Sequence, residues 1–188
     1  MKLYVVRHGE SETNRRGYWT GWLDVALTDK GLEDAKRAGE VIGGVAFDKV
    51  YSSDLIRARK TAETALPDCS YEATPLLREI NVGDIAGKPL TVMTPEMRKI
   101  AAEFGYGDMG GESTAQLNGR IREFMEQVES LDCENVAAFS HAGWLRGMLD
   151  QVVGIRLPRK SIICGNCTVA VFDYTDGVWR LHSWINVT

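Results

Sequence analysis

Histidine is the scarcest residue here that can carry acid–base or nucleophilic chemistry: His8, His141 and His182 are the only three among 188 residues. His8 and His141 each follow a short apolar run, and a glycine comes within two positions of each. A neutral imidazole is a nucleophile near pH 7, whereas a protonated one is a hydrogen-bond donor and a cation, so two imidazoles can divide these roles. Either histidine alone could be structural. Their shared position after apolar runs predicts a common site.

Two arginines accompany these histidines. Arg7 precedes His8, and Arg57 follows the next strand-like run. Side chains alternate along a strand, but this alternation lapses at a strand end, so Arg7 and His8 can face one pocket. Arg57 would lie in the first turn of a helix, where backbone amides add positive potential; a surface salt bridge is the alternative. Since guanidinium groups match phosphoryl oxygens bidentately, the set indicates an anionic, phosphoryl-like substrate group.

The sequence indicates no catalytic role for the third histidine or for the cysteines. His182 alternates with apolar residues in a strand-like run, which predicts a place on a strand face. Cys69, Cys133, Cys164 and Cys167 are too few and too scattered for a disulfide framework. Cys164 and Cys167 have C-x-x-C spacing, but no second pair completes a zinc site, and a strand rather than a helix follows them. We therefore expect no bound metal, and the role of this pair stays open.

The elements that must position these residues alternate between strand-like and helical patterns. An α/β fold follows: a three-layer sandwich with a mostly parallel central sheet, helices on both faces and an antiparallel edge hairpin around Thr175-Asp176-Gly177. In such sheets ligands bind outside the carboxyl ends of the strands. The expected strands are 2–6, 49–52, 135–140, 167–174 and 178–185, and the expected helices are 28–43, capped by Thr28, 53–66, capped by Ser53 or Asp54, 95–104, 113–131 and 144–153.

Composition limits the number of domains and the kinds of partner that the chain can bind. The sequence has 22 basic and 26 acidic residues, a net charge of −4 and 44% hydrophobic residues, which predicts one domain over residues 1–188 with a substantial core. No basic run supports binding to nucleic acid or to an anionic membrane surface. The apolar run at the N-terminus is too short for a signal peptide, and no stretch is long enough for a membrane helix. A cytoplasmic protein is expected.

Several blocks together resemble the histidine phosphatase superfamily, the phosphoglycerate mutase-like fold. Arg-His-Gly alone is a weak signal, but the blocks occur in family order over nearly the whole chain. They are Arg7-His8-Gly9-Glu10-Ser11-Glu12-Thr13-Asn14, Thr20-Gly21-Trp22, Leu27-Thr28 with Gly31, Ser52-Ser53 with Arg57-Ala58 and Thr61-Ala62, Leu77-Arg78-Glu79-Ile80 with Gly83 and Gly87, Gly110-Gly111-Glu112-Ser113, and Ser140-His141-Ala142-Gly143.

The resemblance implies a role for each matching residue. His8 would attack phosphorus and become a phosphohistidine, and no metal or other cofactor would be needed. Glu79 would protonate the leaving alkoxide and then activate water; from the sequence alone, Arg78-Glu79 could equally be an exposed pair at a strand end. The clamp around the phosphoryl oxygens would be Arg7, Arg57 and His141, and neutral substrate contacts would come from Asn14, Thr20 and Gly21.

The family divides between phosphatases and cofactor-dependent mutases, which share this histidine. A mutase must exclude water while its reaction intermediate reorients in the site. The segment between Glu79 and His141 shows no long covering insertion, and Gly110-Gly111-Glu112-Ser113 resembles the phosphatase branch. We therefore expect a phosphomonoester hydrolase for a small phosphorylated metabolite. The alternatives are a phosphoglycerate mutase-type phosphotransferase and a non-catalytic protein that binds a phosphorylated ligand.

Short family members resemble α-ribazole phosphatases, sugar-phosphate phosphatases and broad-specificity phosphatases, and the sequence does not choose among these substrates. The edge of the final hairpin could pair with a second copy in a homodimer, or nearby Lys and Arg side chains could guard that edge.

Overall fold

Six strands form one mixed sheet in the computed structural model, which describes residues 1–158 and 161–187. The strand order is β3-β2-β4-β1-β5-β6. The first four strands of that order are parallel, and β5 and β6 run antiparallel as a hairpin at one edge. The expected α/β fold is therefore confirmed. The strands are β1 (Lys2–Arg7), β2 (Lys49–Ser53), β3 (Glu72–Thr74), β4 (Asn135–Ser140), β5 (Val169–Thr175) and β6 (Val178–Ile185).

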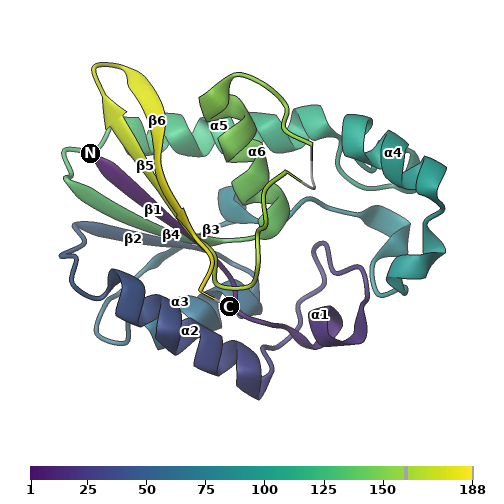
Figure 1. Cartoon of the computed structure of the whole chain (residues 1–188), viewed down its shortest axis with the longest axis horizontal. Coiled ribbons are helices and arrows are strands. Elements are labelled where there is room, and N and C mark those ends of the chain that lie inside the picture. The colour runs from purple at the N-terminus through teal and green to yellow at the C-terminus, as the bar shows by residue number, and fades with distance from the viewer. Residues whose placement is uncertain (159–160, 188) are drawn as a thin grey trace.

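Helices cover both faces of the sheet, as Figure 1 shows, with α2 and α3 on one side and α5 and α6 on the other. Thr28 caps α2 as the sequence predicts, and Thr94 and Ser113 cap α4 and α5. The helices are α1 (Glu12–Arg16), α2 (Asp29–Ile42), α3 (Ile56–Ala65), α4 (Pro95–Phe104), α5 (Thr114–Glu129) and α6 (Ala142–Val153). Short 3₁₀ turns lie at Pro75–Leu77, Gly83–Ile85, Leu90–Val92 and Gly107–Met109.

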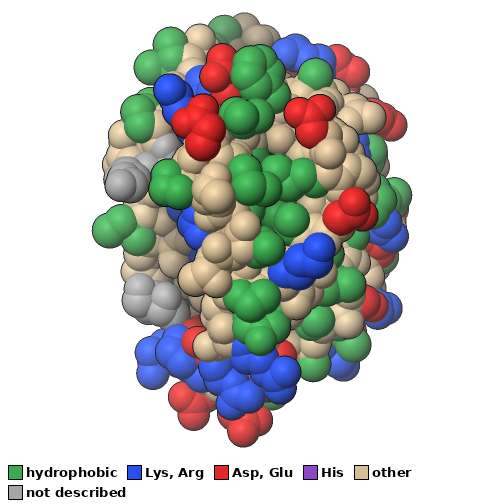
Figure 2. Space-filling model, turned by 90° about the vertical axis from the view of Figure 1, so that its right-hand side faces the viewer, with side chains coloured by type: hydrophobic (Ala, Val, Ile, Leu, Met, Phe, Trp, Pro, Cys, Tyr) green, Lys and Arg blue, Asp and Glu red, His purple; other side chains and the backbone are tan. Residues whose placement is uncertain are grey.

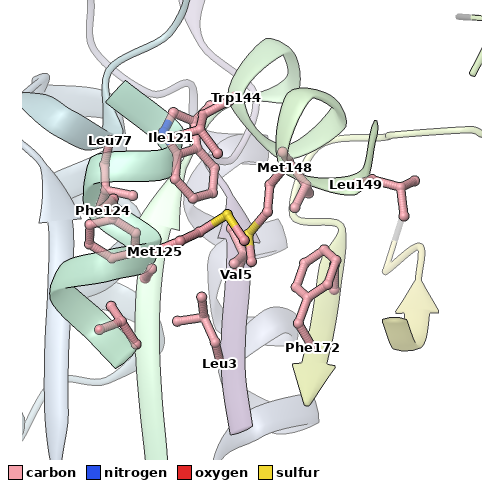
Figure 3. Packing of buried hydrophobic residues seen from close by; sticks show 14 of the residues in the cluster. Leu3, Val5, Leu77, Ile121, Phe124, Met125, Trp144, Met148, Leu149 and Phe172 are labelled. Carbon is pink, nitrogen blue, oxygen red and sulfur yellow. The ribbon is translucent and has the colours of Figure 1, made fainter. Parts of the chain in front are cut away.

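The central strands are apolar on both faces because each face packs on helices. Leu3 and Val5 of β1 point into a core shared with α5 and α6, where Figure 3 shows them beneath Met125 and Met148. Val6 belongs to the opposite core, with α2 and α3. This double burial fixes β1, and with it Arg7 and His8, at the centre of the molecule.

Some local expectations were wrong. The N-cap of α3 is Leu55, without a side-chain cap, rather than Ser53 or Asp54. Asp54 instead pairs with Arg78 at 2.6 Å. Leu32 and Val41 of α2 are exposed, so this helix buries only part of its apolar residues. The inner face of α2 consists of small residues and Ile42 because this helix packs closely on α3 and the sheet.

Two elements lie in segments for which the sequence predicts no regular structure. α1 occupies part of the expected polar loop after His8, and Ser11 and Asn14 close a capping box at its start. β3 has only three residues and pairs with β2. Neither carries an apolar pattern long enough to be recognised.

The face shown in Figure 2 carries Lys and Arg interspersed with Asp and Glu, around a central group of hydrophobic side chains, and no histidine is in view. Within the described residues, no helix has the length and apolar character needed to cross a membrane.

Candidate active site

A cleft of about 1040 Å³ opens where β1 and its parallel neighbours end. The strands β1, β4 and β2 lie in parallel at neighbouring positions of the sheet. Their carboxyl ends, at Arg7, Ser140 and Ser53, are therefore close together. Seven of the eight site residues predicted from the sequence line this cleft; His141 lies against His8, with the two ring centroids 5.1 Å apart. The seven are Arg7, His8, Asn14, Thr20, Gly21, Arg57 and Glu79.

His8 is held as a neutral imidazole with a lone pair on one ring nitrogen. Its Nδ1 lies 2.7 Å from the carbonyl oxygen of Gly9, which can only accept, so Nδ1 carries the ring proton. Nε2 then accepts a long hydrogen bond, 3.3 Å, from Nε of Arg57. Burial, followed by the charges of Arg57 and Arg7, lowers the pKa of His8 well below the usual 6.5. The nitrogen on the Arg57 side is therefore unprotonated at neutral pH.

His141 begins α6 as its N-cap and is fully buried. Its Nε2 lies 2.9 Å from Oγ of Ser53, and its buried Nδ1 has no hydrogen-bond partner in the part of the chain that is described. Burial, followed by the charge of Arg57, lowers its pKa well below 6.5. An unpaired buried ring nitrogen is costly unless a ligand meets it.

The two arginines differ in how they are held. Arg57 is fully buried, and its Nη1 and Nη2 each donate at 2.8 Å to the carbonyl oxygens of Leu23 and Gly21. Burial lowers its pKa to about 10, so it remains a cation at neutral pH. Arg7 donates to the carbonyl oxygen of Cys164 at 2.5 Å, while its buried Nε finds no partner among the described residues. Burial is also the main cause that lowers the pKa of Arg7.

Glu79 reaches the cleft from the segment that follows β3. Its Oε1 accepts from the amide of Ile80 at 2.9 Å, and its Oε2 accepts from the amide of Gly143, in the first turn of α6, at 3.2 Å. Trp22 Nε1 and Arg120 Nη2 both donate to the Glu79 carbonyl oxygen. Glu79 is therefore tied to the site from both sides rather than exposed at a strand end.

The polar groups of the three residues predicted as neutral contacts differ in the hydrogen bonds that they already make. The Thr20 hydroxyl lies 2.6 Å from the hydroxyl of Thr13, and the Gly21 carbonyl oxygen is used by Arg57. Asn14 Oδ1 accepts two hydrogen bonds, from the amide of Ser11 and from Asn166 Nδ2, each at 3.2 Å. Nδ2 of Asn14 is thus the amide group left for a ligand.

His182 and the cysteines lie apart from this chemistry. His182 is on an exposed face of β6, 2.9 Å from Asp173. All four cysteines are free thiols. Burial raises the pKa of both Cys164 and Cys167, the latter to about 12. Within the described residues, no three His, Cys, Asp or Glu side chains are grouped in a way that could hold a metal ion.

Several residues serve the site although the sequence analysis assigns them no role; Ser53 and Thr61 stand in the blocks that resemble the family, and Arg146 does not. Thr61 accepts from the amide of Gly9 at 3.0 Å, and Ser53 contacts His141. Arg146 lines the cleft, and its buried Nε has no partner in the described part of the chain. Thr61 lies one helical turn after Arg57, which places both residues on the same face of α3.

Known proteins share this sequence pattern and this fold. The sequence profile of the histidine phosphatase superfamily, branch 1, matches residues 3–187. A broad-specificity phosphatase of Saccharomyces cerevisiae is 30% identical over 187 residues, which cover 93% of this chain and 80% of the yeast protein. A probable phosphoglycerate mutase of Erwinia tasmaniensis is 27% identical, covering 98% of this chain and 90% of that protein. The crystal structure of a phosphoglycerate mutase from Thermus thermophilus is 30% identical, with a TM-score of 0.78 and coverage of 99% of both chains.

Proposed function

The chain belongs to the histidine phosphatase superfamily, and from this premise we propose that it is a metal-independent phosphomonoester hydrolase. The observation that carries the proposal is the state of His8: Nδ1 is bonded to the carbonyl oxygen of Gly9, and burial, followed by the charges of Arg57 and Arg7, lowers the pKa of His8. The two guanidinium groups also provide positive charge for an incoming phosphoryl group. A neutral nucleophile beside cations is what attack on a phosphate ester needs.

In the first step, Nε2 of His8 attacks phosphorus, a P–N bond forms, and the P–O bond to the organic group breaks. Glu79 gives its proton to the departing alkoxide. Arg7, Arg57 and His141 bind the phosphoryl oxygens and stabilise the charge of the transition state. The unpaired Nε of Arg7 and Nδ1 of His141 support this assignment, because among the described residues neither has a partner and an anion would supply one.

In the second step, water attacks the phosphohistidine. Glu79, now a carboxylate, takes a proton from water as the new P–O bond forms and the P–N bond breaks. Inorganic phosphate leaves, and His8 returns to its neutral state with the proton on Nδ1. Asn14, Thr20 and Gly21 line the same cleft and are assigned to neutral contacts with phosphate or substrate.

The size of the cleft supports hydrolysis of an organic phosphate. A volume of about 1040 Å³ matches the upper range of small-molecule sites, so an organic group and water both fit, whereas a mutase must keep water from its phosphoenzyme. Apolar side chains such as Ile80, Val82 and Met93 also line the cleft. The yeast relative's name, a broad-specificity phosphatase, agrees with a roomy site.

The test is a panel of phosphomonoesters assayed for phosphate release with and without EDTA, using wild type, His8→Ala and His182→Ala. We expect release that EDTA does not affect, that His8→Ala abolishes, and that His182→Ala preserves, because His182 is exposed on β6 outside the cleft. Turnover by His8→Ala would disprove the covalent mechanism, and loss of activity in EDTA would indicate a metal enzyme.

Mutase activity is the second candidate because the relatives from Erwinia tasmaniensis and Thermus thermophilus carry that name. Isomer exchange of phosphoglycerate, primed with bisphosphoglycerate, measures it directly. Exchange much faster than phosphate release from every ester of the panel would assign the chain to phosphotransfer instead. Phosphate binding without either reaction would indicate a non-catalytic binding protein.

A further inference from the structure

The segment Cys164-Gly165-Asn166-Cys167 lies against the proposed site and has no part in the reaction above. The carbonyl oxygen of Cys164 accepts from Arg7, and the amide of Cys167 donates to the carbonyl oxygen of His8 at 3.3 Å. Asn166 Nδ2 lies 3.2 Å both from that same carbonyl oxygen and from Oδ1 of Asn14. The segment therefore meets three residues of the cleft.

These contacts fix which way each amide side chain points. A main-chain carbonyl oxygen only accepts, so the Asn166 group beside the His8 carbonyl oxygen must be the NH₂ group. The main-chain amide of Ser11 only donates, so the Asn14 atom 3.2 Å from it must be Oδ1. Donor therefore meets acceptor at every contact from His8 through Asn166 and Asn14 to Ser11.

The consequence appears at Asn14. Since Oδ1 already accepts from Ser11 and Asn166, the cleft-lining side chain has its Nδ2 left to offer. A phosphoryl group presents oxygen acceptors with negative charge. An amide turned the other way would place its oxygen against those acceptors and repel them.

We propose that Asn166 is a positioning residue, which holds the Asn14 amide so that its NH₂ group, and not its oxygen, meets the phosphoryl group. The inference rests on the proposed function, in which Asn14 contacts phosphate or substrate. It assigns a role to the C-x-x-C segment that involves neither metal nor sulfur chemistry. The raised pKa of both buried thiols agrees with it, because the reactive form of cysteine is the thiolate.

A double-mutant cycle tests the proposal. Asn166→Leu removes the donor at similar size and adds no charge, and Asn14→Ala removes the proposed target. Asn166→Ala provides a second donor-free variant, and thermal unfolding checks that every variant folds. The matched control is Asn186→Leu: Oδ1 of Asn186 accepts hydrogen bonds from Gly165 and Thr168 of the same region, but the described hydrogen bonds do not join it to His8 or Asn14.

The measurements are inorganic phosphate affinity by calorimetry, and KM and kcat on one aryl phosphate. We expect Asn166→Leu to weaken phosphate binding and to raise KM by about tenfold, the effect of losing a hydrogen bond to an anion. In the Asn14→Ala background the same change should have less than about a twofold effect, because the interaction it supports is already gone. Asn186→Leu should leave both values near wild type.

Three results would overturn the proposal: no change in Asn166→Leu, an equal loss in both backgrounds, or an equal loss in Asn186→Leu. An equal loss in both backgrounds would place the effect at the His8 carbonyl oxygen, and an equal loss in the control would mean general loosening of the segment. Failure of the proposed function is separate: wild type would bind phosphate and hydrolyse no ester, while the cycle on phosphate affinity would still decide the role of Asn166.

Discussion

In several residues of this site, neighbouring groups hold one polar atom of the side chain and thereby determine which atom is left for a ligand. His8 can offer Nε2 as a nucleophile because Gly9 holds Nδ1, and Asn14 can offer Nδ2 because Ser11 and Asn166 hold Oδ1. Glu79 differs, since both of its carboxyl oxygens are bonded to main-chain amides before any ligand arrives. The proposed acid role of Glu79 therefore depends on where these two hydrogen bonds hold its carboxyl group. Replacing Glu79 tests that role.

Glu79→Gln should separate substrates by leaving group. An aryl phosphate has a leaving group that needs little protonation, so its attack by His8 should be nearly preserved, seen as a burst of phenolate. An alkyl phosphate needs the proton, and its turnover should fall by about 10²–10⁴-fold. Stopped-flow bursts and steady-state rates measure the two effects. Equal slowing of both esters would remove the general-acid role from Glu79.

At the scale of elements, the start of α6 is joined to the segment that carries Glu79. His141 is the N-cap of α6 and Gly143 binds Glu79, so the first turn of this helix supplies two parts of the site. On the other side, Glu112 pairs with Arg120 at 2.7 Å, and Arg120 donates to main-chain carbonyl oxygens of the segment that carries Glu79. The Gly-Gly-Glu-Ser motif thus supports the site indirectly, because its Glu112 holds Arg120, which in turn holds the main chain around Glu79.

Gly143→Ala should impair the site through this packing. A Cβ at position 143 would overlap Oε1 of Glu79, so the carboxyl group must move. We expect a clear fall in kcat for alkyl phosphates with little change in phosphate affinity. Gly119→Ala on α5 is the control, since its Cβ meets nothing within 4 Å; it should keep full activity and gain about 0.5–1 kcal/mol of stability. Full activity in Gly143→Ala would contradict the contact.

At the scale of the whole molecule, the site lies at the carboxyl ends of central strands whose two faces belong to separate hydrophobic cores. β1 is packed by helices on either face, and the neutral His8 and His141 are buried at the carboxyl ends of β1 and β4. Burial lowers the pKa of both imidazoles, so the unfolded chain binds more protons than the folded chain below about pH 6.5. The fold must therefore lose stability on acidification in that range.

Urea unfolding between pH 7.5 and pH 5 measures this linkage. Each buried histidine should contribute a loss of about 1.4 kcal/mol per pH unit below pH 6.5, until its own depressed pKa is reached. His8→Gln cannot titrate and should reduce the slope by one such increment. Equal slopes in wild type and His8→Gln would show that His8 is not held neutral.

The family resemblance and the α/β fold, both readable from the sequence, are confirmed. Apolar runs, glycines and caps are local signals, so the positions of β1, β4, α2, α4 and α5 follow from short stretches of chain. The three-residue strand β3 escapes such signals because only its pairing with β2 makes it a strand. The predicted cap of α3 is wrong because both candidates meet distant residues: Asp54 pairs with Arg78, 24 positions away, and Ser53 contacts His141, 88 positions away.

By itself, the sequence determined that His8 and His141 follow central strands, because strand ends are marked by composition. Only the tertiary structure decided which polar atom each side chain presents. Asn166 reaches His8 across 158 positions and Asn14 across 152, and Thr61 reaches Gly9 across 52. Hydrogen-bond direction and burial depend on neighbours brought together by folding, and no local pattern encodes them.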